Sequence, residues 1–91
     1  MVRNRNKVAA SIPLFDTTLF IDGIPTYYSV AMEENKFRYL PSYENIIYPL
    51  PAFTVWQNDD SWYVESTDPD LTERETIEQA VEKIKRYYFY D

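Results

Sequence analysis

Hydrophobic and polar residues alternate through much of the first half of the chain, which is the pattern of half-buried β-strands. Asp22-Gly23 interrupts the alternation and fits a type I′ hairpin turn, because both of its residues tolerate positive φ angles. Pairing Ile21 with Ile24 across this turn gathers the apolar residues on one face of the hairpin. The residues on that face are Phe15, Leu19, Ile21, Ile24, Tyr28, Val30 and Met32.

A second turn is predicted at Glu34-Asn35, since Asn tolerates the left-handed region. It pairs Met32 with Phe37, so a third strand adds its apolar residues to the same face. The two turns together predict a three-stranded meander across residues 15–40. Pro25 lies inside this meander and cannot donate to a ladder, so we expect it at an edge or beside the turn.

Residues 52–66 predict a further hairpin, with its turn at residues 58–61. Pairing Val55 with Val64 across the hairpin sets its register and directs alternate side chains to opposite faces of the sheet. The inward residues are Phe53, Val55, Trp62 and Val64, and the outward residues are Thr54, Trp56, Tyr63 and Glu65. The segment before it, 41–51, holds three prolines but is too apolar for a free linker. We therefore expect 41–51 to pack on the domain, with a short strand or turn at 45–48.

The C-terminal third predicts one amphipathic helix. Residues 72–75 form a capping box, and acidic residues near the start with basic residues near the end suit the helix dipole. An i,i+4 ion pair is expected between Glu82 and Arg86. The apolar stripe consists of Ile77, Ala80, Val81, Ile84, Tyr87 and Tyr88. The predicted class is α+β, a mainly antiparallel sheet of about five strands (meander plus hairpin) with this helix packed on one face.

Length and charge set the domain organisation. A chain of 91 residues with 45% hydrophobic residues is sized for one domain, which we place at 13–91 behind a flexible basic arm at 1–12. Arg3, Arg5 and Lys7 make the arm basic, whereas the whole chain has a net charge of −6. The arm is interpreted as a solvated tail, with contact to nucleic acid as the alternative.

Composition excludes much familiar chemistry. With one glycine and neither cysteine nor histidine, the chain lacks phosphate-cradling loops, thiolate nucleophiles, histidine bases and the usual zinc ligands. The acid pairs at 59–60, 68/70 and 73/75 suit turns and a helix start. We therefore predict no catalytic residue, no metal and no cofactor, and expect a protein that is not an enzyme. A hydrolase with converging carboxylates is the enzymatic alternative.

No stretch approaches the eighteen apolar residues of a membrane span, and no segment resembles a signal peptide. We expect a soluble, cytoplasmic protein with no membrane partner.

The predicted second face of the sheet carries aromatic residues without an evident cover. Either segment 41–51 folds across this face, or the face is exposed and binds a partner. Because Trp, Tyr and Arg dominate binding hot spots, the second possibility gives a set of candidate partner-binding residues. They are Phe20, Tyr27, Arg38, Trp56 and Tyr63.

The best-supported function from sequence is a small accessory or protein-interaction domain. It would use the aromatic sheet face or the C-terminal aromatic cluster, Tyr87-Tyr88-Phe89-Tyr90, to bind a protein or a second copy. One alternative is a nucleic-acid-binding module that uses the arm and the sheet aromatics, which the net negative charge disfavours. Another is an inhibitor whose acidic stretch, 59–82, imitates a nucleic acid.

Overall fold

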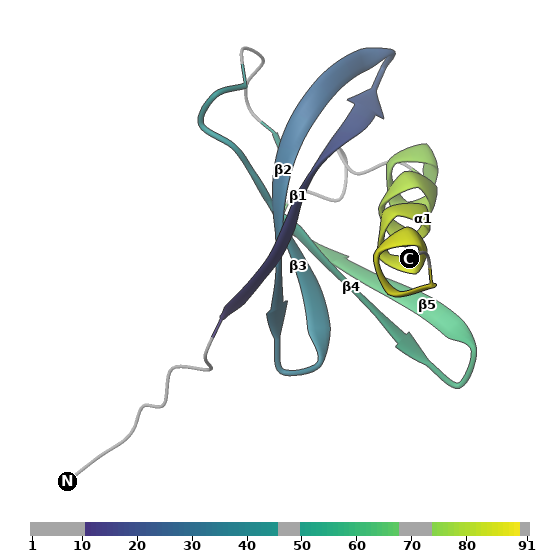
Figure 1. Cartoon of the computed structure of the whole chain (residues 1–91). Coiled ribbons are helices and arrows are strands. Elements are labelled where there is room, and N and C mark those ends of the chain that lie inside the picture. Colours follow the sequence, from purple (N-terminus) through teal and green to yellow (C-terminus); the bar gives the residue numbers. More distant parts are fainter. Residues whose placement is uncertain (1–10, 46–49, 68–73, 90–91) are drawn as a thin grey trace, which may run out of the picture.

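A computed structural model describes residues 11–45, 50–67 and 74–89 of the chain. Its strands form one antiparallel sheet in chain order, and a helix follows them (Figure 1). The elements are β1 (Ile12–Ile21), β2 (Ile24–Glu33), β3 (Lys36–Pro41), β4 (Phe53–Asn58), β5 (Ser61–Ser66) and α1 (Arg74–Phe89). The predicted α+β class, with a meander, a further hairpin and a C-terminal helix on the sheet, is confirmed. Of the predicted arm, only Ser11 and Ile12 are described, and β1 begins at Ile12.

The three hairpin turns share one geometry. Positive φ angles occur at Asp22 (54°), Gly23 (76°), Glu34 (53°), Asn35 (65°), Asp59 (53°) and Asp60 (68°). Two successive residues with positive φ define a type I′ turn, whose twist matches that of the strands it joins. The predicted pairs Ile21 with Ile24, Met32 with Phe37 and Val55 with Val64 are all confirmed. A register shift between Pro13 and Phe15 in β1 was not predicted.

The sheet is strongly twisted, so the β1–β2 and β4–β5 hairpins diverge and α1 lies in the opening between them (Figure 1). Pro25 pairs with Phe20 near the β1–β2 turn. The backbone N–H and C=O of Phe20 both bond to the side chain of Gln79 on α1, so this pair makes no hydrogen bonds across the ladder. The missing N–H of Pro25 therefore removes no ladder bond, as expected for a proline beside the turn.

Three aromatic side chains form the centre of the core between the sheet and α1. Tyr39 stacks on Phe53 with ring centroids 4.8 Å apart, and Tyr28 meets Phe53 at 5.6 Å. The Tyr28 hydroxyl donates to the carbonyl of Pro51 at 3.0 Å, and the Tyr39 hydroxyl donates to the Ala80 carbonyl at 2.7 Å. Both buried hydroxyls are thus satisfied, so the core keeps its aromatic area without an unpaired polar group. Around the three rings lie Leu19, Val30, Val55, Ala80 and Ile84.

The helix runs antiparallel to β1. Gln79 lies at Phe20 near the end of β1, and Tyr87 packs on Phe15 nearer its start, with ring centroids 4.8 Å apart. Tyr88 meets Phe37 at 5.8 Å. Part of the C-terminal aromatic cluster therefore packs on the sheet, although Tyr87 and Tyr88 each remain nearly half exposed.

The predicted ion pair of α1 between Glu82 and Arg86 is present at 3.4 Å. The first two residues of the predicted capping box, 72–73, lie outside the described part of the chain, as do residues 90–91.

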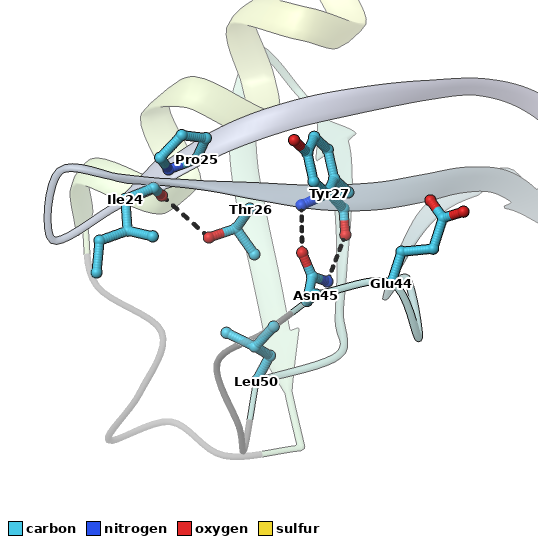
Figure 2. A pocket seen from close by; sticks show the side chains of 7 residues that line it. All are labelled: Ile24, Pro25, Thr26, Tyr27, Glu44, Asn45 and Leu50. Carbon is cyan, nitrogen blue, oxygen red and sulfur yellow. Dashed lines mark hydrogen bonds between the residues drawn. The ribbon is translucent and has the colours of Figure 1, made fainter.

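Asn45 continues the sheet where β3 ends. The Tyr27 N–H donates to its Oδ1 at 2.7 Å, and its Nδ2 donates to the Tyr27 carbonyl at 2.9 Å (Figure 2). The same Nδ2 donates to the Ser42 carbonyl at 2.8 Å. The Ser42 N–H also donates to the Tyr27 carbonyl, at 2.9 Å, so the buried amide adds the acceptor for the Tyr27 N–H that a neighbouring strand would otherwise supply. The start of segment 41–51 thus packs on the domain beside β2, and residues 46–49 lie outside the described residues.

Substitution of Asn45 by Ala is expected to lower the free energy of unfolding by about 1–3 kcal/mol, because the Tyr27 N–H loses its acceptor, although the Tyr27 carbonyl keeps the Ser42 N–H. The neighbouring Glu44→Ala is the matched control, since Glu44 is exposed and a surface change costs under about 0.5 kcal/mol. Urea unfolding followed by circular dichroism measures both. Equal stability of the two variants would contradict this role of Asn45.

Alkaline pH is expected to destabilise the fold through the core tyrosines. Burial raises the pKa of Tyr28 to about 12 and raises the pKa of Tyr39 further. The unfolded chain releases these protons near pH 10, whereas the folded chain retains them. Stability is therefore full below about pH 10 and falls as pH rises towards about 12.

Unfolding in urea from pH 8 to 12 tests this dependence. The Tyr28→Phe/Tyr39→Phe variant should be less stable at pH 8 by about 1 kcal/mol for each lost hydrogen bond. Its stability should also fall less between pH 10 and 12. Parallel pH curves for the variant and the natural chain would show that other groups cause the alkaline loss.

Candidate functional site

The face of the sheet opposite α1, called here the outer face, carries the large side chains that the core does not use. Phe20, Tyr27, Leu40 and Tyr63 are each between 39% and 52% exposed, so no described residue buries them. The described turn at residues 42–45 lies beside β2, where it prolongs the sheet past the end of β3. The described residues therefore leave an open, partly aromatic sheet face.

The candidate partner-binding residues all lie on this outer face, but the register separates them into two groups. Phe20 and Tyr27 lie near the β1–β2 turn, where Tyr27 pairs with Thr18. Arg38, Trp56 and Tyr63 lie on the three later strands. Along β2, Tyr27 is four residues, or about 13 Å, from the residue that pairs with Arg38. The structure therefore brings together three of the five candidates and not the other two.

The second group forms an ordered cluster with a residue that the sequence analysis missed. Trp56 and Tyr63 are cross-strand partners whose rings stack with centroids 5.9 Å apart. The Lys36 ammonium lies 4.3 Å from the centroid of the Trp56 ring. Arg38 donates to the Thr54 hydroxyl at 3.3 Å and lies 3.9 Å from a Glu33 carboxylate oxygen. Lys36, Arg38, Trp56 and Tyr63 are called the outer-face cluster below.

The position of Lys36 beside Trp56 can be predicted only from the register in which β3 pairs with β4. In that pairing Phe37 lies opposite Val55 and Arg38 opposite Thr54, which brings Lys36 next to Trp56. A two-residue turn would have revealed this register, but the connection between these strands spans 42–52 and leaves it open.

A second surface lies between β5 and α1, on the opposite side of the sheet. It is a groove of about 650 Å³ whose apolar walls are Trp62 and Val64 on the strand and Ile77 and Val81 on the helix. The predicted inward direction of Trp62 and Val64 is confirmed, but Val64 is 44% exposed because the helix packs mainly on β1 and β4. This surface is called the β5–α1 groove, and the sequence analysis did not identify it.

A smaller pocket of about 360 Å³ lies beside β2 at the end of β3 (Figure 2). Ile24, Pro25 and Leu50 form its apolar part, and Asn45 uses its amide on Tyr27. Asn45 and Leu50 bracket residues 46–49, which are not described, so no site is assigned to this pocket.

The titratable groups of the described residues include acids in exposed turns and tyrosines in the core. No group of three or more His, Cys, Asp or Glu side chains that could hold a metal ion occurs there. Asp59 and Asp60 are the central residues of an exposed turn, and the acid pairs at 68/70 and 73/75 include residues outside the described part. The raised pKa values of Tyr28 and Tyr39 belong to neutral core hydroxyls that donate to carbonyl oxygens. Across the described ranges, no helix is long and apolar enough to span a membrane.

Comparison of the chain with protein-family models, with curated proteins and with solved structures gave no match. The outer-face cluster and the β5–α1 groove are therefore the features of this chain that bear on its function.

The edges of the sheet differ in how they are covered. On β1, the Gln79 Oε1 accepts from the Phe20 N–H and its Nε2 donates to the Phe20 carbonyl, both at 2.7 Å. On β5, the described chain places no further strand beyond the pairing with β4. The helix thus caps part of the β1 edge, and within the described residues it leaves the β5 edge uncapped.

Amide hydrogen exchange should report this difference at single residues. The Phe20 amide is expected to exchange slowly in the natural chain and at least about tenfold faster in Gln79→Ala, because its acceptor is lost. The matched control is Glu78→Ala, which changes an exposed neighbour on the same helix. A Phe20 amide that exchanges at one rate in all three proteins would show that Gln79 does not cap this edge in solution.

Proposed function

We propose that this chain is a non-enzymatic protein-interaction domain that binds a protein partner through its outer-face cluster. The observation that carries the proposal is the stacked pair of Trp56 and Tyr63, which is ordered by neighbouring strands and still exposes 45% of Tyr63. Trp, Tyr and Arg are the residue types that most often dominate the energy of protein interfaces. The cluster contains all three.

The cluster is ordered before any partner arrives. Cross-strand pairing, ring stacking and the ammonium of Lys36 all restrict the Trp56 ring. Binding to an ordered surface loses less side-chain entropy, which strengthens the complex. Lys36 and Arg38 also place two cations beside the rings. The cluster therefore suits a partner that presents an apolar or aromatic side chain next to a carboxylate.

Nucleic acid is the second candidate, because stacked aromatic rings beside two cations are also a platform for single-stranded bases. Glu33 lies 3.9 Å from Arg38 and offsets one of those charges. The net charge of −6 opposes binding to a polyanion as well. The protein partner is therefore the better supported of the two.

Affinity capture from a lysate with the natural chain and Tyr63→Ala tests the proposal. We expect Tyr63→Ala to weaken retention of a specific protein at least about tenfold, since hot-spot truncations cost more than about 1.4 kcal/mol. The matched control is Tyr27→Ala, because Tyr27 lies on the same face with a similar exposed fraction but outside the cluster. The captured protein is then titrated against all three purified chains.

Both variants should stay folded and lose a similar amount of stability, about 1 kcal/mol, because each truncates a half-exposed ring on the same face of the sheet. Equal affinity of Tyr63→Ala and the natural chain for the captured protein would refute the role of the cluster. Retention of nucleic acid alone, with an affinity that falls steeply with salt, would replace the proposal by the nucleic-acid alternative.

A further inference from the structure

No described strand pairs with the outer edge of β5, and this edge presents backbone hydrogen-bonding groups at two identified residues. Asn58 and Ser61 flank the type I′ turn, so they form a hydrogen-bonded pair in a two-residue hairpin. Hydrogen-bonded pairs alternate along an antiparallel ladder. The bond from the Thr67 N–H to the Ala52 carbonyl, at 2.9 Å, fits this alternation. The backbone groups of Trp62 and Val64 therefore point away from β4, towards the open edge.

The same two residues line the β5–α1 groove with their side chains. A strand added along this edge would pair with the Trp62 and Val64 backbones. Every second side chain of that strand would then enter the groove and contact Ile77 and Val81 on the opposite wall. Backbone pairing and alternating side-chain pockets are the two components of recognition by strand addition.

Charge along the helical rim of the groove indicates which occupant fits. From the start of α1, the rim carries Arg74, Glu78, Glu82 and Lys85, an order of plus, minus, minus, plus that is nearly symmetric about residue 80. A two-fold axis that pairs β5 with β5 of a second copy would run the two helices antiparallel. Glu78 would then face Glu82 of the second copy, and Arg74 would face Lys85. Like charges would meet throughout, which disfavours a second copy.

Glu78 and Glu82, the two acids in the middle of the rim, are accessible to a cationic ligand. Glu78 lies 3.8 Å from Arg74 and Glu82 lies 3.4 Å from Arg86, and these pairs are largely exposed. Exposed pairs contribute little to stability and exchange readily for other cations. Asp59 and Asp60 add further acids at the turn that precedes β5, and the whole chain has a net charge of −6.

We propose that the β5 edge and the β5–α1 groove together accept an extended cationic segment of a protein partner as a sixth strand. Its Lys or Arg residues alternate with apolar residues and are the side chains that enter the groove. The aliphatic stems of these cations contact Trp62, Val64 and Val81, and their charged ends reach Glu78 and Glu82 at the helical rim. This site lies on the other side of the sheet from the outer-face cluster and is independent of the function proposed for it.

Three capped nine-residue peptides test the proposal against the full chain. One alternates Lys and Val, the second has the same composition with its Lys and Val residues in separate blocks, and the third alternates Glu and Val. Nuclear magnetic resonance titration measures affinity, and amide exchange locates the contact. We expect the alternating Lys/Val peptide to bind at least tenfold more tightly than the other two. It should also slow exchange of the Trp62 and Val64 amides at least tenfold.

Two variants separate the components of the site. Glu78→Gln/Glu82→Gln removes the central charges and is expected to weaken the alternating peptide at least tenfold. Tyr27→Ala is the matched control, because Tyr27 lies on the outer face of β2, away from β5, so this variant should leave the affinity within twofold. If Tyr27→Ala lost peptide binding and the Gln variant kept it, the assignment of the surface would be overturned.

Other outcomes also decide the proposal. Equal affinity for the alternating and block peptides would show attraction by charge alone and overturn it. Protection of the Trp62 and Val64 amides that rises with protein concentration in the absence of peptide would overturn it in favour of a second copy. A failure here would leave the Tyr63→Ala result of the capture experiment unaffected, because the two surfaces use different residues.

Discussion

The position of α1 depends on one buried side chain, Tyr39. Its ring stacks on Phe53 in the middle of the sheet, and its hydroxyl donates to the carbonyl of Ala80 in the helix. A buried hydroxyl that found no acceptor would cost more than the hydrogen bond contributes, so the helix must pass where the Ala80 carbonyl can accept it. The contact joins residues 41 positions apart in the chain and sets the distance between the two layers.

The Gln79 amide on Phe20 and the Tyr87 ring on Phe15 hold α1 towards β1. The consequence appears at the opposite side of the sheet, where Trp62 and Val64 point inward but are incompletely covered. The groove, and the lack of helical cover along the β5 edge among the described residues, therefore follow from where the helix is attached. An edge of this kind invites pairing with another chain unless a partner or a protective feature covers it.

Aromatic residues have different roles on the two sides of the sheet. On the side of α1, Tyr28 and Tyr39 use their hydroxyls as donors inside the core, so they stabilise the fold only while neutral. On the outer face, Tyr63 stacks on Trp56 and keeps much of its surface in water. The sequence analysis assigned these directions correctly because alternation along a strand separates the two faces. It could not show that Phe20 and Tyr27 lie apart from the rest of the outer-face candidates.

The sequence by itself determined the three hairpins, their registers and the amphipathic helix, because two-residue turns and the helical repeat act over short distances. Only the tertiary structure decided the pairing of β3 with β4, which brings Lys36 to Trp56, since a long connection leaves the register open. Tertiary contacts also placed the amides of Asn45 and Gln79 on backbone groups 18 and 59 residues away. Such bonds leave no periodic signal, because they depend on where distant segments meet once the core has packed.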